Sequence, residues 1–243
     1  MNTISKLCLI SYLLFGISFT SQATELVPHK ASYSAKIQKG MSIKGKAVRE
    51  LKKSQNGQWL YSFDVKSFVA DIDESTLLSW HDNQVVPHLY NYKLSAFLTS
   101  DRLKKVNFDW SKMIAINPLK KKGWIINDIP SGTLDRLSFQ LQLGMDLQSG
   151  KQEMFYQVAD KGKLRENHFR VTGEVEINTA FGTIQSITVE KVRDKSKKRK
   201  TTMWFSKQYP LVLLKMLQVE KDGKRYEINI TQASIDGKNI TFN

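Results

Sequence analysis

Apolar and polar residues alternate with a period of two along most of the chain. The alternation covers residues 33–37, 43–47, 59–65, 106–110, 155–158, 171–177, 184–189 and 226–230, with a one-residue shift of phase inside 184–189. Successive side chains of an extended strand point to opposite faces, so this pattern is typical of strands with one face on a core and the other in water. The chain is therefore predicted to be rich in half-buried strands.

Turn signals separate these stretches. They read "QNGQ", "HDNQ", "KKKG", "DKGK", "KDGK" and "IDGK". Asn-Gly and Asp-Gly favour tight hairpins because both residues tolerate positive φ. Strands joined by such turns favour an antiparallel meander over a parallel α/β sheet.

One stretch, residues 131–150, breaks the alternation and predicts a helix near 133–148. Its apolar residues recur at helical spacing, at Leu134, Leu137, Leu141 and Met145. Ser131 or Thr133 is expected to cap the start, and Gly150 to end the helix. The predicted fold class is all-β with one central helix, as an antiparallel curled sheet or incomplete β barrel whose concave face takes the helix. Two separate sandwiches on either side of the helix are the alternative.

The first 23 residues are predicted to be a signal peptide. The apolar run from Leu7 to Phe19 is too short to span a bilayer comfortably, which disfavours a membrane anchor. Ser21 and Ala23 supply small side chains for cleavage after Ala23. Residues 24–243 then form a single β-barrel-like domain in the periplasm. The only cysteine, Cys8, is removed with the peptide, which excludes disulfides, a cysteine nucleophile and cysteine-ligated metals.

The formal net charge of +14 indicates anionic partners. For an exported protein these are lipid head groups, lipopolysaccharide or polyanionic glycans, and nucleic acid is excluded. A basic run falls at a predicted hairpin tip, and its candidate contacts to an anionic membrane surface are Lys195, Lys197, Lys198, Arg199 and Lys200. A solvated turn is the simpler interpretation. Trp204 and Phe205 follow the run instead of alternating with it, which also disfavours nucleic-acid binding.

The sequence contains no recognisable catalytic motif, and no cofactor, metal or catalytic residue is predicted. Four histidines are scattered without ligand spacing. In "DIDES", Asp71 and Asp73 would share one strand face and Glu74 the other. Such a pair could bind a hard cation, but the glycine and further oxygen ligands of a dedicated loop are missing, so a solvated turn is favoured.

Aromatic residues are concentrated on the predicted strands, and most are expected to form the core. A small barrel can also keep an apolar pocket, so a cavity for an acyl chain is the alternative. Its predicted lining residues are Trp59, Tyr61, Phe63, Phe108, Trp110, Leu137 and Leu141.

Several segments resemble, in order, an exported bacterial family known as domain of unknown function 3108. They include "YSAKIQKGMSIKGKAVREL", "DRLSFQLQL", "VTGEVEINTAFGTIQSITVEKV" and "TTMWFSKQYPLVLLKM". The family pattern falls on Tyr33, Gly40, Asp135, Ser138, Gly173, Glu174, Thr179, Gly182, Trp204 and Pro210. The resemblance covers residues 27–232 and implies an all-β envelope protein, with no catalytic residues to transfer. At the level of architecture the chain is also distantly similar to periplasmic lipoprotein carriers, which are half-open barrels.

These observations favour a non-enzymatic periplasmic protein that binds a lipid, an acyl chain or another apolar ligand in a half-open barrel. Two alternatives remain open. One is a structural or assembly partner that docks on another envelope protein. The other is an enzyme acting on glycans or peptidoglycan through Asp71, Asp73 or Glu74, which would need two carboxyl groups about 5–10 Å apart.

Overall fold

A computed structural model describes residues 25–54, 56–97, 99–120, 122–192 and 199–242. The predicted signal peptide lies outside these residues, as do Lys195, Lys197 and Lys198 of the predicted basic run.

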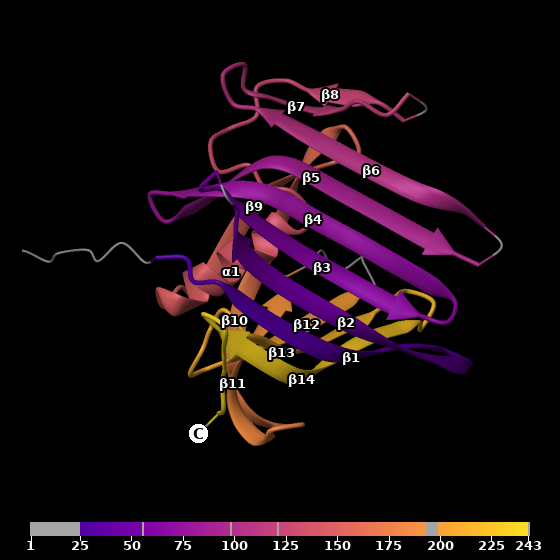
Figure 1. The fold of residues 1–243 in the computed structure, drawn as a ribbon, viewed down its shortest axis with the longest axis vertical. Coiled ribbons are helices and arrows are strands. Elements are labelled where there is room, and N and C mark those ends of the chain that lie inside the picture. Colours follow the sequence, from indigo (N-terminus) through magenta and orange to yellow (C-terminus); the bar gives the residue numbers. More distant parts are fainter. Residues whose placement is uncertain (1–24, 55, 98, 121, 193–198, 243) are drawn as a thin grey trace, which may run out of the picture.

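The strands form one continuous 15-stranded sheet, in the order β8-β7-β6-β5-β4-β3-β2-β1-β14-β13-β12-β11-β10-β9, with β15 paired to β14. The first layer contains β1 (His29–Lys39), β2 (Met41–Lys53), β3 (Trp59–Ser67), β4 (Ala70–His81), β5 (Gln84–Ala96), β6 (Thr99–Asp109), β7 (Ile114–Asn117) and β8 (Trp124–Ile126). The second contains β9 (Glu153–Asp160), β10 (Lys163–Thr179), β11 (Gly182–Lys191), β12 (Lys200–Ser206), β13 (Leu213–Val219), β14 (Arg225–Ile235) and β15 (Lys238–Asn239). The helix α1 (Ser138–Gln148) lies between the layers (Figure 1).

The two edges of this sheet approach each other, so the sheet curls into a nearly closed antiparallel barrel. Leu134 bridges to Val158 on β9, where the Leu134 N–H donates to the Gln157 carbonyl at 2.8 Å. The β9–β10 turn also approaches β8, because a Cβ placed on Gly162 would lie 3.3 Å from the Cβ of Trp124. The predicted all-β fold with one central helix, in the form of an incomplete barrel, is therefore confirmed, and two separate sandwiches are not found.

Tight turns lie where the sequence predicted them. Both central residues have positive φ in "HDNQ" (Asp82 49°, Asn83 60°) and in "IDGK" (Asp236 49°, Gly237 73°). Paired positive φ values are the signature of the type I′ turn, whose twist matches that of the flanking strands. These turns explain why consecutive strands pair antiparallel along the chain.

The helix starts later than predicted, at Ser138, and Asp135 caps the turn that leads into it. The Asp135 carboxylate accepts hydrogen bonds from the N–H groups of Leu137 and Ser138 at 2.8 and 2.9 Å, and the Ser138 hydroxyl accepts one from the Asp135 N–H. This reciprocal arrangement satisfies N–H groups that the helix itself leaves free. Thr133, a predicted cap, donates its hydroxyl to the Pro130 carbonyl instead. At the other end Gly150 has φ 82° and ends the helix as predicted.

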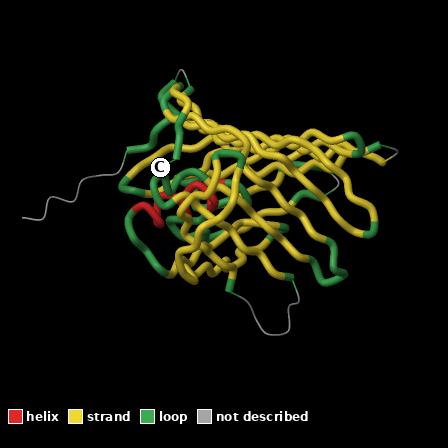
Figure 2. Tube along the Cα trace, turned by 90° about the horizontal axis from the view of Figure 1, so that it is seen from below, coloured by secondary structure: helices red, strands yellow, loops and turns green. Residues whose placement is uncertain are grey.

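The barrel has two different ends, which we call the closed end and the open end. The closed end holds α1, whose Gln142 accepts a hydrogen bond from the Val85 N–H at 2.8 Å beside the β4–β5 turn. The open end carries the β1–β2, β3–β4, β5–β6 and β13–β14 hairpins. Figure 2 shows the helix confined to one side, with the strands extending well beyond it.

Burial of the inner face changes between the two ends. Toward the closed end the inward side chains are buried, including Ala31, Leu51, Trp59, Tyr61, Thr76, Leu78, Tyr90, Val106 and Phe108. Toward the open end Tyr33 and Ala47 are still buried, but most inward side chains are only partly buried, including Ala35, Ile37, Ile43, Phe63, Val65, Ile72, Tyr92 and Leu94. The same strands therefore line a packed core and, further along, an inner face that solvent reaches.

Candidate functional site

A row of charged and aromatic side chains crosses the inner face between the two ends. Strand register places one residue from each of β1 to β6 side by side, and we call this set the inner row: Ala31, Arg49, Phe63, Glu74, Tyr92 and Lys104. The neighbouring row on its closed-end side is His29, Leu51, Tyr61, Thr76, Tyr90 and Val106. The inner row is therefore the boundary between the packed core and the open end.

Arg49 is the most unusual member of the inner row, because its guanidinium is buried without a carboxylate partner. The residue is 3% exposed, and it forms no ion pair with any residue that the structure describes. One nitrogen, Nη2, donates to Gln140 of α1 at 2.7 Å, while Nε is buried without a hydrogen-bond partner. The group otherwise lies against the rings of Phe63 (5.1 Å) and Tyr61 (5.8 Å). A buried charge without a counterion is costly, so Arg49 is a strong candidate for contact with an anion.

Glu74 supplies the negative charge of the inner row, but its partner is a hydroxyl. The Tyr90 hydroxyl donates to the Glu74 carboxylate at 2.5 Å. Burial raises the pKa of Glu74, while the Tyr90 hydrogen bond and the positive charge of Arg136 act in the opposite direction. The inner row thus holds two basic side chains, Arg49 and Lys104, against one acidic side chain. The local balance at the inner row is therefore positive.

The far side of the row contains two more cations, Lys104 and Arg136, which share one carboxylate. Asp160 lies 3.8 Å from Lys104, 3.7 Å from Arg136 and 3.8 Å from Arg165. Burial lowers the pKa of Lys104, and the positive charge of Arg136 adds to this effect. One carboxylate thus faces three cations here, which leaves this side of the open end receptive to anions as well.

The sequence contained a signal for this row that composition did not reveal. Arg49 continues the inward alternation of Gly45 and Ala47, and Lys104 continues that of Val106 and Phe108. Charged residues in phase with core positions are rare, because burying them is costly. Charged residues at core positions of several strands in one sheet are therefore the sequence pattern that would have identified the site.

The predicted pocket residues belong to the core. Trp59, Tyr61, Phe108, Leu137 and Leu141 are buried, and Phe63 and Trp110 are partly buried and pack against them. Of the seven, Phe63 is also a member of the inner row. That these side chains contact a ligand stays a prediction.

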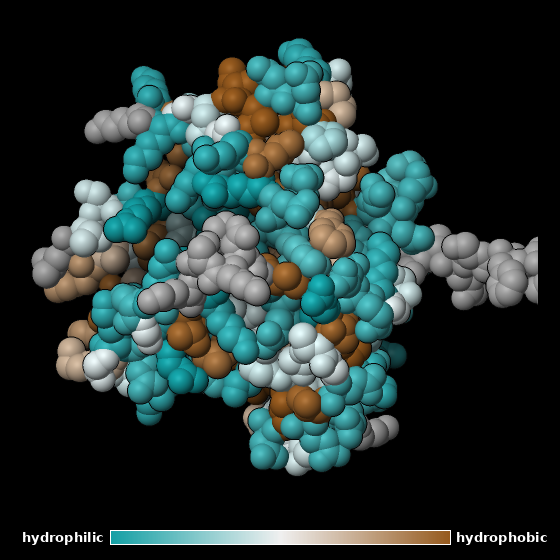
Figure 3. Space-filling view, turned by 180° about the vertical axis from the view of Figure 1, so that it is seen from behind, coloured by the Kyte–Doolittle hydropathy of each residue, from teal (hydrophilic) through white to brown (hydrophobic). Residues whose placement is uncertain are grey.

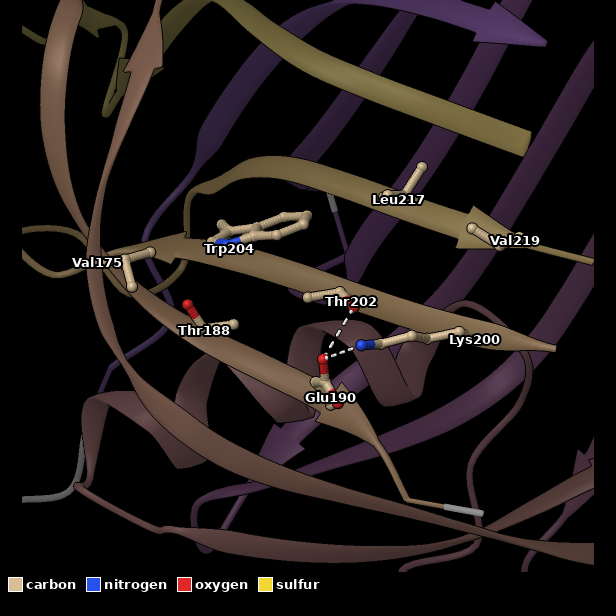
Figure 4. A pocket seen from close by; sticks show the side chains of 8 residues that line it. All are labelled: Val175, Thr188, Glu190, Lys200, Thr202, Trp204, Leu217 and Val219. Atoms are coloured by element: carbon tan, nitrogen blue, oxygen red, sulfur yellow. Dashed lines mark hydrogen bonds and ion pairs between the residues drawn. The ribbon is translucent and has the colours of Figure 1, made fainter. Parts of the chain in front are cut away.

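Two hollows border the second layer, the first on its outer face and the second against the last turn of α1, which contributes Leu147. The first, of about 320 Å³, lies between β10 and β13 and is lined by Val175, Thr188, Glu190, Lys200, Thr202, Trp204, Leu217 and Val219 (Figure 4). The second, of about 370 Å³, lies beside the β10 bulge and includes Gly173 and Ile187. Neither contains a predicted pocket residue. From behind, this face is mostly hydrophilic, with small separate hydrophobic patches (Figure 3).

The described part of the predicted basic run is engaged in ion pairs. Arg199 lies 2.7 Å from Glu220, and Lys200 lies 2.9 Å from Glu190. Lys195, Lys197 and Lys198 are outside the described residues. Contact of this run with an anionic surface stays a prediction.

The acidic segment of β4 is divided between the two faces of the strand. Asp71 and Asp73 both pair with Lys66, at 3.4 and 3.0 Å, while Glu74 belongs to the inner row. In the described ranges, no three or more His, Cys, Asp or Glu side chains are arranged to hold a metal ion. Across those same residues, no helix has the length and apolar character needed to cross a bilayer.

The model of one protein family, described as "Protein of unknown function (DUF3108)", matches residues 32–231. Curated proteins give no match. Among solved structures, a beta-barrel-like DUF1849 protein from Brucella abortus has a TM-score of 0.59 at 13% identity, over 88% of this chain and 99% of that chain. This similarity shows a shared fold.

Two further solved structures have much lower TM-scores. A DUF1329 family protein from Desulfovibrio piger scores 0.30 at 10% identity, covering 86% of each chain. A domain titled a putative outer membrane lipoprotein-sorting protein, from Vibrio parahaemolyticus, scores 0.24 at 10% identity, covering 87% of this chain and 86% of that one. Neither similarity is close enough to carry an argument about this molecule.

Proposed function

This chain belongs to the DUF3108 family of proteins of unknown function, and we propose that it is a non-enzymatic envelope protein that binds an amphipathic anion at the open end of its barrel. The ligand consists of an alkyl or acyl chain with a carboxylate or phosphate group. The observation that carries the proposal is the buried Arg49 guanidinium, which has no ion pair among the described residues.

The inner row supports binding of the anionic group. The Arg49 Nε–H has no hydrogen-bond partner among the described residues, and the rings of Phe63 and Tyr61 lie against the guanidinium. Hydrogen bonds to charged groups contribute roughly 1.5–3 kcal/mol each, more than bonds between neutral groups. An anion that reaches Arg49 would therefore relieve the cost of its burial and gain affinity at the same time.

The partly buried inner face beyond the row supports binding of the apolar chain. Ala35, Val65, Ile72 and Leu94 extend from the inner row toward the hairpins of the open end. Covering apolar surface contributes roughly 25 cal/mol per Å², so a chain lying along these side chains adds to the affinity. Of the predicted lining residues, this proposal retains Phe63 as a direct contact.

Binding of matched probes by the purified protein tests the proposal. Laurate and dodecyl phosphate carry an anionic group on the same alkyl chain as dodecanol, which is neutral. We expect both anions to bind at least about tenfold more tightly than dodecanol, the equivalent of about 1.4 kcal/mol. The relative affinities of the two anions identify which group the site prefers.

The Arg49→Met variant makes the test specific to the site. Methionine keeps an unbranched side chain but removes the charge, so we expect laurate binding to fall to the level of dodecanol. Lys52→Met is the matched control, because Lys52 is exposed on the outer face of the same strand. Equal laurate binding by Arg49→Met and the wild type, or no binding by the wild type, would refute the proposal.

A further inference from the structure

We propose that the open end of the barrel docks on an anionic membrane surface through the tips of three hairpins. The proposal goes beyond ligand binding, because the side chains involved lie outside the inner row. It rests on Met41 of the β1–β2 hairpin, Phe68 of the β3–β4 hairpin and Phe97 of the β5–β6 hairpin.

These three side chains are the most exposed large hydrophobic residues in the described ranges. Phe68 is 98% exposed, Met41 84% and Phe97 78%, and the next value is 58%. Single exposed apolar residues are common on protein surfaces and need no explanation. Here the three largest exposures occupy three adjacent hairpins at the same end of one sheet (Figure 1).

Hydrogen bonds hold the backbone of two hairpin tips in place, and both tips leave an aromatic side chain exposed. The Ser67 hydroxyl donates to the Ala70 carbonyl at 2.6 Å and accepts from the Ala70 N–H at 3.1 Å. The Phe97 N–H donates to the Val69 carbonyl at 3.1 Å, which ties the β5–β6 tip to the β3–β4 tip. Phe68 and Phe97 are thus presented together by a hydrogen-bonded unit.

Lysine residues surround the same end on the outer face. Register pairs Lys36 with Lys44, and Lys46 with Lys66, directly across neighbouring strands. Like charges in such positions destabilise a sheet. Lys66 is neutralised by Asp71 and Asp73, but Lys36, Lys44 and Lys46 form no ion pair with any described residue. Three unpaired lysines held side by side are complementary to an anionic surface.

The spacing between the apolar tips and the lysines is slightly larger than the depth of a lipid head-group layer. Lys44 is three residues from Met41 along β2, so it lies about 10 Å from the tip at the rise of a strand. The polar region of a bilayer is roughly 5–8 Å deep on each side. When the tips reach the acyl boundary, the lysine backbone lies just outside the head-group layer, and the long lysine side chains can extend to the phosphates, where each contributes to attraction.

Co-sedimentation with vesicles tests this surface, and it requires no bound ligand. We expect the wild-type protein to bind phosphatidylglycerol vesicles, to bind phosphatidylcholine vesicles at least about tenfold more weakly, and to be released by salt. In the Phe68→Ser/Phe97→Ser variant we expect binding to phosphatidylglycerol to fall about tenfold or more. In Lys44→Glu/Lys46→Glu we expect a similar fall and a weaker dependence on salt.

Matched controls lie elsewhere on the barrel. Phe155→Ser removes an aromatic side chain that is 56% exposed on β9, and Lys52→Glu reverses a charge on the same face of β2 at the closed end. Both are expected to bind vesicles like the wild type, and circular dichroism verifies that every variant is folded. Failure of the wild type to bind vesicles, unchanged binding by the tip variant, or an equal loss in the controls would overturn the proposal.

Discussion

The closed and open ends of the barrel are made by the same strands, yet they differ in what covers their inner face. At the closed end α1 lies against the sheet, and residues such as Leu78 and Tyr61 are almost fully buried. At the open end Ile72 and Val65, on the same two strands, remain partly exposed. One short helix therefore divides this sheet into a part whose inner face is packed in the core and a part whose inner face solvent reaches.

The largest expected difference between the ends is in the cost of removing an inward side chain. Leu78 and Ile72 both lie on the inner face of β4, and Leu78 is 0% exposed. We expect Leu78→Ala to lower the free energy of unfolding by about 3–4 kcal/mol, because it leaves a cavity in a packed core. We expect Ile72→Ala to lower it by about 1 kcal/mol, because water already reaches that position.

Urea unfolding followed by tryptophan fluorescence measures both variants. The slope of the unfolding free energy against urea should remain that of the wild type, so that the two changes are comparable. Equal losses from Leu78→Ala and Ile72→Ala would contradict the comparison, because they would mean that the open end is as well packed as the closed end.

The second expected difference is a pH dependence that arises at the closed end, from His29. His29 is 5% exposed, and its Nδ1 lies 3.0 Å from the Val27 carbonyl oxygen. Burial lowers the pKa of His29 from 6.5 to about 4, against the Val27 hydrogen bond and with the help of the Arg49 charge. The unfolded chain therefore binds a proton more readily than the folded one between these values. Folding is penalised progressively as the pH falls through this window.

As the pH falls from 7.5 to 5, we expect His29 to lower the free energy of unfolding by about 2 kcal/mol. Urea titrations at a series of pH values measure this, with the contribution of His29 taken as the difference between the wild type and His29→Gln. His81→Gln is the matched control, because His81 is exposed at the β4–β5 turn, and it should keep the wild-type profile. Identical profiles for His29→Gln and the wild type would show that His29 is accessible to protons when folded.

The sequence predicted the strands and turns far better than the start of the helix and the candidate site. Alternation identified the strands, and turns such as Asp82-Asn83 have the backbone angles that their residues favour. The helix start was misplaced because Leu134 pairs with β9, a contact between distant segments that local spacing does not reveal. The candidate site was missed for a similar reason, because Arg49, Glu74 and Lys104 become neighbours only through strand register.

The smallest expected change in stability is that of replacing Arg49, at the boundary between the two ends. Whether the free energy of unfolding rises or falls is more informative than the size of the change. The guanidinium is buried without a carboxylate, so its desolvation is only partly offset by Gln140 and the two aromatic rings. Replacing such a group with an apolar side chain of similar length is often stabilising. We expect Arg49→Met to raise the free energy of unfolding by about 1 kcal/mol.

Urea unfolding of Arg49→Met in the absence of ligand measures the effect, and Lys52→Met should stay within about 0.5 kcal/mol of the wild type. A loss of stability in Arg49→Met would mean that Arg49 stabilises the closed end, by holding Gln140 and thereby α1 in place. A gain of stability together with a loss of laurate binding would mean that Arg49 acts in ligand binding at the open end. Stability would then have been given up at this residue to keep a positive charge where an anionic ligand can reach it.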